Sequence, residues 1–194
     1  MGLEGLAGVQ ARISEIQQRF VRPPLASIGT APAPGGAGAT DFAALLEQAT
    51  AAPAAGGRAG EFLHAALGQA GDPYVWGASA AATDPDPDAF DCSELTKWAA
   101  KQVGIDLPDG SWLQYLDLKG RGALVPVEQA LRTPGALLFS FSEEPRPGGG
   151  RPAGAHVAIS LGDGRTIEAR GREYGVGTFD AADRFEYGAI IPGL

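Results

Sequence analysis

The change of hydrophobic pattern at Pro134-Gly135 limits the fold of this chain more than any other feature. Before this point, apolar residues recur at helical spacing and predict helices over residues 61–70, 92–104 and 111–118. After it, short apolar segments predict strands over residues 136–141, 156–161, 165–169, 176–179 and 188–191. Asp163-Gly164 separates two of these segments and is typical of a tight hairpin. Helices followed by antiparallel strands predict an α+β domain.

The segment before residue 59 is organised differently. Apolar side chains in steps of three and four predict an amphipathic helical arm over residues 1–21. Residues 22–58 are rich in Pro, Gly and Ala, which predicts a linker with one short helix over residues 41–50. Residues 1–50 either bind a partner or another copy of the chain, or the arm folds back on its own domain. The compact domain is predicted over residues 59–194.

The distribution of charge excludes two classes of partner. The formal net charge is −8 at pH 7, and the four basic and four acidic residues before position 59 cancel. The compact domain therefore carries the whole negative charge and should repel nucleic acid and anionic lipid. No apolar run approaches the roughly 20 residues that a membrane span needs.

The chain also lacks the patterns of metal and cofactor sites. One cysteine and two distant histidines do not make the ligand set of a zinc site. There is no glycine-rich phosphate loop either. We therefore expect no metal and no cofactor.

Cys92 is the single cysteine of the chain, so it cannot form an internal disulfide. Asp91 is a favourable N-cap residue and would place Cys92 in the first turn of the helix over residues 92–104. The helix dipole and the free N–H groups of that turn favour the thiolate, which is the nucleophilic form of cysteine. The alternative is a buried cysteine that acts as a small apolar side chain.

A cysteine nucleophile needs a base, and the chain has two histidines. His64 lies in the first predicted helix and is interpreted as a surface or structural residue. His156 opens a predicted strand, and Glu168 lies on the next one. The hairpin between these strands brings both side chains close together, so that the Glu168 carboxylate could fix the imidazole tautomer. Taken alone, Glu168 would more often be a solvated strand residue.

Four motifs follow one another in the second part of the chain. They are Gly71-Asp72-Pro73-Tyr74-Val75-Trp76-Gly77, Phe90-Asp91-Cys92-Ser93, Pro134-Gly135-Ala136-Leu137-Leu138-Phe139 and His156-Val157-Ala158-Ile159. Together they make residues 60–194 similar to the NlpC/P60 family of cell-wall cysteine peptidases. The resemblance implies a reduced papain-like fold and cleavage of wall peptides next to D-glutamate.

The same resemblance implies a role for individual residues. Cys92 would be the nucleophile, His156 the base and Glu168 the third polar residue, while Tyr74 would stabilise the oxyanion with the backbone N–H of Cys92. Three further residues would bind the stem peptide, namely Asp91, Ser93 and Trp76. The chain departs from the family pattern beside these positions, at Ala78, Glu94 and Ala136. These departures bear on specificity more than on chemistry.

The sequence therefore predicts a peptidoglycan hydrolase, a D-glutamyl–diamino acid endopeptidase that acts by cysteine catalysis on stem peptides. The alternatives are a non-catalytic wall-binding assembly protein and a secreted toxin or phage-tail hydrolase of the same fold. Residues 1–20 lack the features of a secretory signal peptide. We therefore expect the protein to reach the cell wall or periplasm by a non-Sec route. Residues 9–20 resemble leaders of actinobacterial wall hydrolases associated with flagellar genes, which makes flagellar secretion the candidate route.

Overall fold

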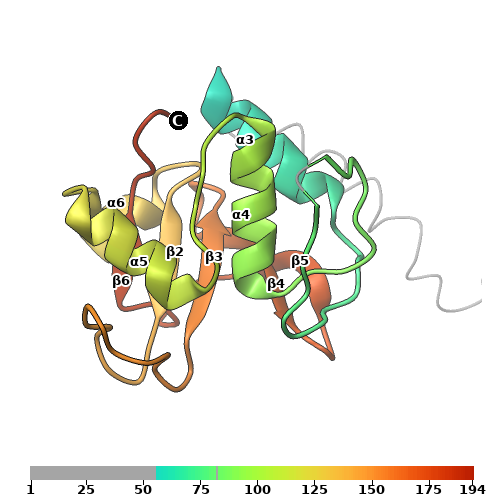
Figure 1. Ribbon diagram of the computed structural model, residues 1–194. Coiled ribbons are helices and arrows are strands. Elements are labelled where there is room, and N and C mark those ends of the chain that lie inside the picture. The colour runs from blue at the N-terminus through green and yellow to red at the C-terminus, as the bar shows by residue number, and fades with distance from the viewer. Residues whose placement is uncertain (1–55, 82) are drawn as a thin grey trace, which may run out of the picture. The chain divides into compact units, whose positions relative to one another are not determined.

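Three helices precede most of the sheet in the computed structural model, which describes residues 56–81 and 83–194 (Figure 1). They are α3 (Arg58–Gly68), α4 (Cys92–Gln102) and α5 (Ser111–Gly120). All three were predicted from the apolar spacing, with ends that differ by a few residues. The order of helices before antiparallel strands confirms the predicted α+β class.

A six-stranded sheet follows, with the strand order β1-β6-β2-β3-β4-β5 and antiparallel pairing throughout. Its strands are β1 (Leu124–Val125), β2 (Leu137–Ser140), β3 (His156–Ser160), β4 (Arg165–Gly171), β5 (Gly175–Asp180) and β6 (Tyr187–Ala189). The sequence did not predict β1 or the short helix α6 (Val127–Leu131). Both are too short to show a recognisable hydrophobic period.

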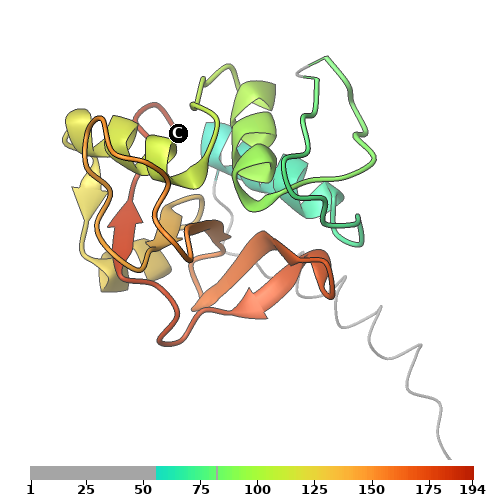
Figure 2. The same ribbon diagram turned by 60° about the horizontal axis from the view of Figure 1, so that its bottom comes forward.

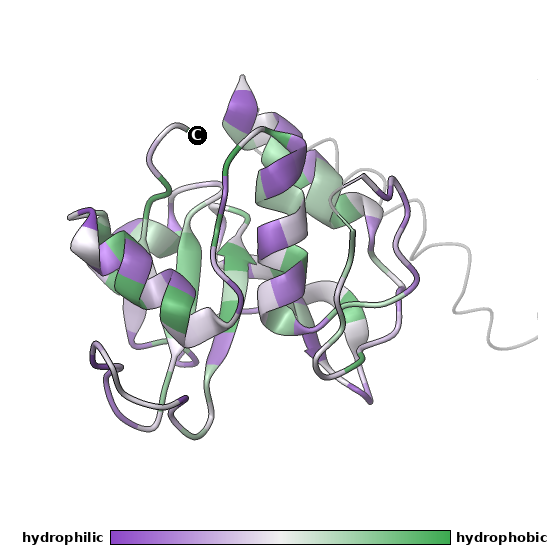
Figure 3. Cartoon of the chain, in the orientation of Figure 1, coloured by the Kyte–Doolittle hydropathy of each residue, from purple (hydrophilic) through white to green (hydrophobic). Residues whose placement is uncertain are grey.

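The two faces of the sheet are covered by different helices. Strand alternation sends Leu137 and Phe139 into the larger core beneath α3, α4 and α5, and sends Leu138 to the opposite face against Ala130 of α6. Figure 2 shows α3, α4 and α5 on one side of the sheet, and Figure 3 shows the hydrophobic colour gathered on the central strands. Each large side chain buried in this way contributes roughly 2–3 kcal/mol to folding.

The β3–β4 hairpin carries the two sheet residues of the predicted site. Ile159 pairs with Ile167 and Ser160 with Thr166, so the same register sets Glu168 one diagonal step from His156. The chain turns at Gly164, whose φ of +86° favours glycine. The predicted hairpin at residues 163–164 is confirmed.

A close backbone approach holds the segment before α4 against the sheet. The Val176 N–H donates to the carbonyl of Asp72 at 2.8 Å, and the Gly71 N–H donates to the carbonyl of Val176 at 2.9 Å. Gly175 has a φ of +64°, and a Cβ there would lie 2.4 Å from the Asp72 carbonyl oxygen. This contact fixes the chain that leads into Tyr74.

The predicted arm over residues 1–21 and the short helix over residues 41–50 lie outside the described residues, as does most of the linker over residues 22–58. These domain assignments stay predictions. Within the described part, no helix combines the length and apolar character needed to cross a bilayer.

Candidate active site

The first turn of α4 presents Cys92, and Asp91 explains why the helix begins there. Asp91 has an extended backbone, and its Oδ1 accepts hydrogen bonds from the N–H of Ser93 at 3.0 Å and of Glu94 at 2.8 Å. The Ser93 hydroxyl donates to the same oxygen, and Oδ2 accepts from the N–H of Gly77 at 3.1 Å. The predicted cap is confirmed, and it also ties the helix to the preceding loop.

The base and its partner come from the sheet. His156 is the first residue of β3, and its Nε2 lies 2.5 Å from Oε2 of Glu168. Because Nε2 is engaged with this carboxylate, Nδ1 is the ring nitrogen left to exchange a proton with Cys92. Glu168 is 1% exposed, so the alternative of a solvated strand residue is wrong.

Two groups besides His156 compensate the buried charge of Glu168. The guanidinium of Arg184 donates two hydrogen bonds of 2.8 Å, one to each carboxylate oxygen. The Thr166 hydroxyl donates to Oε1 at 2.6 Å. Burial raises the pKa of Glu168, but the bonds from His156, Arg184 and Thr166 outweigh burial and lower it to about 2. The carboxylate therefore stays ionised next to the imidazole.

The same balance decides the charge of His156. Burial lowers the pKa of the ring, but hydrogen bonds to Cys92 and Glu168 and the charges of both groups outweigh it and raise the pKa to about 9. An imidazole with a raised pKa holds its proton at neutral pH and can pass it to a leaving group. His64, by contrast, is exposed on α3, as the sequence indicated.

Tyr74 reaches the site through an isolated bridge to Phe90, two residues before Cys92. Its pKa is raised by burial and by the negative charges of Cys92 and Asp91, with Arg151 and Arg172 opposing them. The phenol therefore stays protonated at neutral pH and can donate a hydrogen bond to a developing oxyanion.

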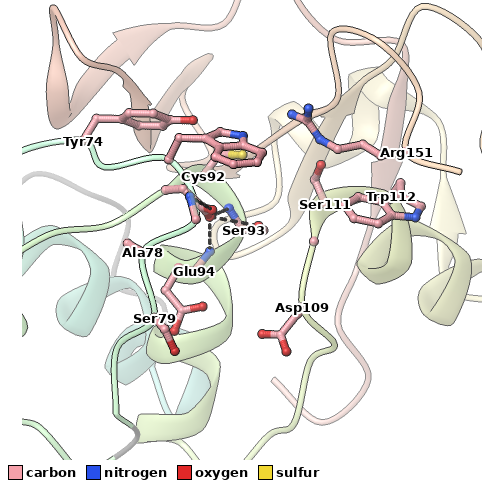
Figure 4. A pocket seen from close by; sticks show the side chains of 14 residues that line it. Tyr74, Ala78, Ser79, Cys92, Ser93, Glu94, Asp109, Ser111, Trp112 and Arg151 are labelled. Atoms are coloured by element: carbon pink, nitrogen blue, oxygen red, sulfur yellow. Dashed lines mark hydrogen bonds between the residues drawn. The ribbon is translucent and has the colours of Figure 1, made fainter.

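Five predicted residues line one pocket of about 370 Å³. They are Tyr74, Trp76, Asp91, Cys92 and Ser93. Figure 4 shows Cys92 inside this pocket, with Tyr74 on one side and Trp112 and Arg151 on the other. His156 and Glu168 are not among the lining residues. His156 hydrogen-bonds to Cys92, and Glu168 bonds in turn to His156.

Several residues of the site were not found from the sequence. Ser111 and Trp112 enter the pocket from the start of α5, and Arg151 enters from the loop between β2 and β3. Arg184 follows β5 in a turn. None of them lies in a motif, and a single arginine in a glycine-rich loop gives no signal before the loop is placed.

Glu94 has a structural use that its sequence position did not indicate. It is 5% exposed, its Oε1 accepts a hydrogen bond from the N–H of Ala80 at 2.8 Å, and its Oε2 pairs with Lys97 at 2.8 Å. Glu94 therefore ties the start of α4 to the loop after Trp76. In the described part of the chain, no cluster of three His, Cys, Asp or Glu residues is placed to hold a metal ion.

Comparison with known proteins finds a family match and several related sequences. The model of the NlpC/P60 family matches residues 71–185. A probable endopeptidase of Corynebacterium glutamicum is 44% identical over 133 residues, which cover 67% of this chain and 52% of that protein. A probable endopeptidase of Mycobacterium tuberculosis is 36% identical over 122 residues, which cover 63% of this chain and 26% of that protein. The chain thus spans between about a quarter and a half of these relatives.

Solved structures show the same fold. The peptidoglycan hydrolase RipB of Mycobacterium tuberculosis superposes with a TM-score of 0.53 at 28% identity, covering 78% of this chain and 77% of RipB. The NlpC/p60 domain of the peptidoglycan hydrolase SagA superposes with a TM-score of 0.52 at 29% identity, covering 69% of this chain and 98% of that domain.

Proposed function

The chain belongs to the NlpC/P60 family, and we propose that it is a peptidoglycan hydrolase that cuts stem peptides with Cys92 as its nucleophile. The observation that carries this proposal is the network of Cys92, His156 and Glu168 beside a pocket lined by Tyr74. The peptidoglycan hydrolases RipB and SagA, which share the fold, support the substrate class.

The proposed reaction has two stages. The Cys92 thiolate attacks the scissile carbonyl, and the oxyanion accepts hydrogen bonds from Tyr74 and the backbone N–H of Cys92. The intermediate collapses, the C–N bond breaks, and the His156 imidazolium gives its proton to the leaving amine. Water then attacks the thioester while His156 takes its proton, and the C–S bond breaks to release the acid and restore the thiolate.

The bond that we propose the protein cleaves is the one between D-glutamate and the diamino acid of the stem peptide. The pocket supports a charged peptide substrate, because it carries the cation of Arg151 as well as the carboxylates of Asp91, Glu94 and Asp109. Asp91 and Ser93 stay the predicted contacts to the peptide, with Trp76 at the pocket wall.

A purified tripeptide of L-Ala, γ-linked D-Glu and the diamino acid tests this proposal. Wild-type protein should release the free diamino acid, detected by mass spectrometry, and Cys92→Ala should release none while its thermal unfolding stays close to wild type. An isomer with an α-linked L-Glu is the control for specificity, and equal cleavage of both isomers would contradict the D-glutamyl assignment. Turnover by Cys92→Ala at the wild-type rate would contradict the mechanism.

The alternative of a wall-binding protein without activity is less well supported. A binding surface does not need a buried carboxylate that makes four hydrogen bonds to three side chains beside a cysteine, because desolvating such groups is costly. The intact network therefore favours hydrolysis. Muropeptide binding without any released amine would reverse this choice.

The proposed substrate lies outside the cytoplasmic membrane, so we propose that the protein acts in the cell wall or periplasm. Export by a non-Sec route through residues 1–50 remains part of this proposal. Deletion of residues 1–50 should stop export and leave cleavage of the tripeptide unchanged. Secretion that survives the deletion would contradict this role of the arm.

A further inference from the structure

Arg184 is held in a turn that points it at Glu168. The turn follows β5, and Asp183 within it has a φ of +56°, which is uncommon for a residue other than glycine. Nη1 of Arg184 donates to the carbonyl of Asp180 at 2.7 Å as well as to Oε1 of Glu168 at 2.8 Å, and Nη2 donates to Oε2 at 2.8 Å. The guanidinium therefore binds the carboxylate as a bidentate fork, which fixes the plane of the carboxylate.

Hydrogen bonds to both oxygens restrict the rotation of the Glu168 carboxylate. Oε1 accepts from Arg184 and Thr166, and Oε2 accepts from Arg184 and lies 2.5 Å from the His156 ring nitrogen. The next residue, Phe185, stacks on His156 with ring centroids 6.3 Å apart and planes 20° apart, and the Arg184 guanidinium lies 5.0 Å from the Phe185 ring. Two consecutive residues thus hold the imidazole, one directly and one through Glu168.

We propose that Arg184 is a positioning residue of the site, which acts through Glu168 to set both the orientation and the protonation of His156. This inference rests on the proposed function for its effect on catalysis. The fork stops Glu168 from rotating, so the imidazole keeps Nδ1 directed at Cys92. The guanidinium charge also offsets part of the carboxylate charge, so the imidazolium is stabilised less than it would be by Glu168 alone.

The groups around His156 come from several elements. Cys92 contacts it from α4 and Glu168 from β4, and these two charges act on the ring directly. Further charged and titratable groups lie beside those two. Cys92 and Asp91 act on Tyr74, as do Arg151 and Arg172, and Arg184 bonds to Glu168. Among the residues that the structure describes, Arg184 is the cation whose side chain bonds to the Glu168 carboxylate.

Two variants separate the fork from the charge. Arg184→Lys keeps the positive charge and loses the fork, while Arg184→Met loses both. Arg170→Met is the matched control, because Arg170 also stacks on aromatic rings, at 4.9 Å from Tyr174 and Phe179, and makes no bond to Glu168.

The first measurement is the titration of His156 by NMR in a Cys92→Ala background, with and without each substitution. The chain has only two histidines, and exposed His64 serves as an internal reference. Removing the guanidinium charge should raise the pKa of His156 by about one unit in Arg184→Met, while Arg184→Lys and Arg170→Met leave it within a few tenths. An unchanged or lowered pKa in Arg184→Met would overturn the effect on protonation.

The second measurement is cleavage of the stem tripeptide by the same substitutions in the presence of Cys92. We expect kcat to fall about tenfold or more in Arg184→Met and several-fold in Arg184→Lys, with KM nearly unchanged, because loss of the fork lets the imidazole move. The alkaline limb of the pH profile should move upward only in Arg184→Met. Should Arg184→Met fail to fold, a wild-type kcat in Arg184→Lys would still overturn the positioning role.

The two measurements also separate this inference from the proposed function. If wild-type protein cleaves no stem peptide, the proposed function fails, and the titration in the Cys92→Ala background still decides whether Arg184 controls His156.

Discussion

The helix half of the site consists of residues 90–94 and of Tyr74, which is bridged to Phe90. The sheet half consists of His156, Glu168 and Arg184, and the two halves hold their charges in different ways. In the helix half, Asp91 faces the pocket, and its Oδ1 bonds to backbone N–H groups two and three residues further along the chain, with one further bond between Oδ2 and the N–H of Gly77. In the sheet half, Glu168 is 1% exposed and bonds to side chains 12 and 16 residues away.

Because of this difference, substitutions in the two halves should affect catalysis and folding stability to different degrees. A local cap makes a modest contribution to folding, because its groups could also bond to water in the unfolded chain. A buried ion pair is costly to break, because removing one partner leaves an uncompensated charge in the interior. We therefore expect changes in the helix half to affect mainly catalysis, and changes in the sheet half to affect catalysis and folding together.

Among variants that keep the Cys92 nucleophile, the largest effect on catalysis is expected for His156→Ala, which removes the base. Its kcat should fall about 10³-fold, because general acid–base catalysis by a positioned side chain is lost. His64→Ala is the matched control and should keep the wild-type rate, since His64 is exposed on α3. Rates are measured as release of the diamino acid from the tripeptide, and an equal loss in both variants would show that the site is wrongly assigned.

Glu168→Gln tests the coupling within the sheet half. It should lower kcat about 10²-fold and also lower the free energy of unfolding by about 2–3 kcal/mol, because Arg184 loses its ionised partner. Urea denaturation measures the second effect. Adding Arg184→Met should restore part of the stability, since the unpaired cation is gone. Strictly additive losses in the double variant would show that the two residues are not coupled.

Tyr74→Phe tests whether catalysis can be lost without a loss of folding stability. Removing one oxyanion donor should lower kcat about 10²-fold, while the free energy of unfolding stays within about 0.5 kcal/mol of wild type. Tyr174→Phe, at an exposed tyrosine near the β4–β5 turn, is the control and should leave both unchanged. A stability loss in Tyr74→Phe as large as in Glu168→Gln would remove the contrast between the halves.

The sheet half should also make stability depend on pH. The pKa of His156 is raised from 6.5 to about 9, so its contribution is complete below pH 6.5 and is lost as the pH rises through 9. The pKa of Glu168 is lowered from 4.5 to about 2, so its contribution is present above pH 4.5 and is lost as the pH falls through 2.

The free energy of unfolding should therefore be highest between pH 4.5 and 6.5 as far as this pair is concerned. It should fall on either side by on the order of 2 kcal/mol. Urea denaturation from about pH 2 to about pH 9.5 measures both declines of the profile. His156→Gln should lack the alkaline decline, and a variant that keeps it would assign the decline to another group.

Asp91→Ala removes the cap of α4 and should affect stability less than Glu168→Gln does. Its free energy of unfolding should fall by about 1 kcal/mol, while Asp91→Asn, which still accepts hydrogen bonds, should lose only a few tenths. Thermal unfolding of both variants measures the difference. An Asp91→Ala loss that exceeds that of Glu168→Gln would reverse the order of the two halves.

Much of the helix half could be predicted because its signals are local. Asp91 before Cys92 is a cap signal that a few residues contain completely, and the structure places the start of α4 at Cys92. The hairpin at Asp163-Gly164 is a local signal as well, and it was enough to bring His156 and Glu168 together. Their catalytic roles stay predictions.

The partners of Glu168 could be predicted only in part. The hairpin indicated His156, but nothing near Arg184 in the sequence shows that its turn returns to β4. The burial of Glu168 was also hidden, because a strand pattern does not show which elements cover its second face. The presence of Ser111 and Arg151 in the pocket could not be predicted either, because their positions depend on where α5 and the β2–β3 loop pack.

By itself, the sequence determined the α+β order of elements, the capped cysteine and the hairpin that pairs a histidine with a glutamate, because short-range hydrogen bonding and hydrophobic period set these features. The tertiary structure alone decided that Glu168 is buried and ionised, that Arg184 clamps it, and that Tyr74 and Arg151 face Cys92 across one pocket. Charges acquire their partners only when distant segments pack together, since water replaces those partners in the unfolded chain.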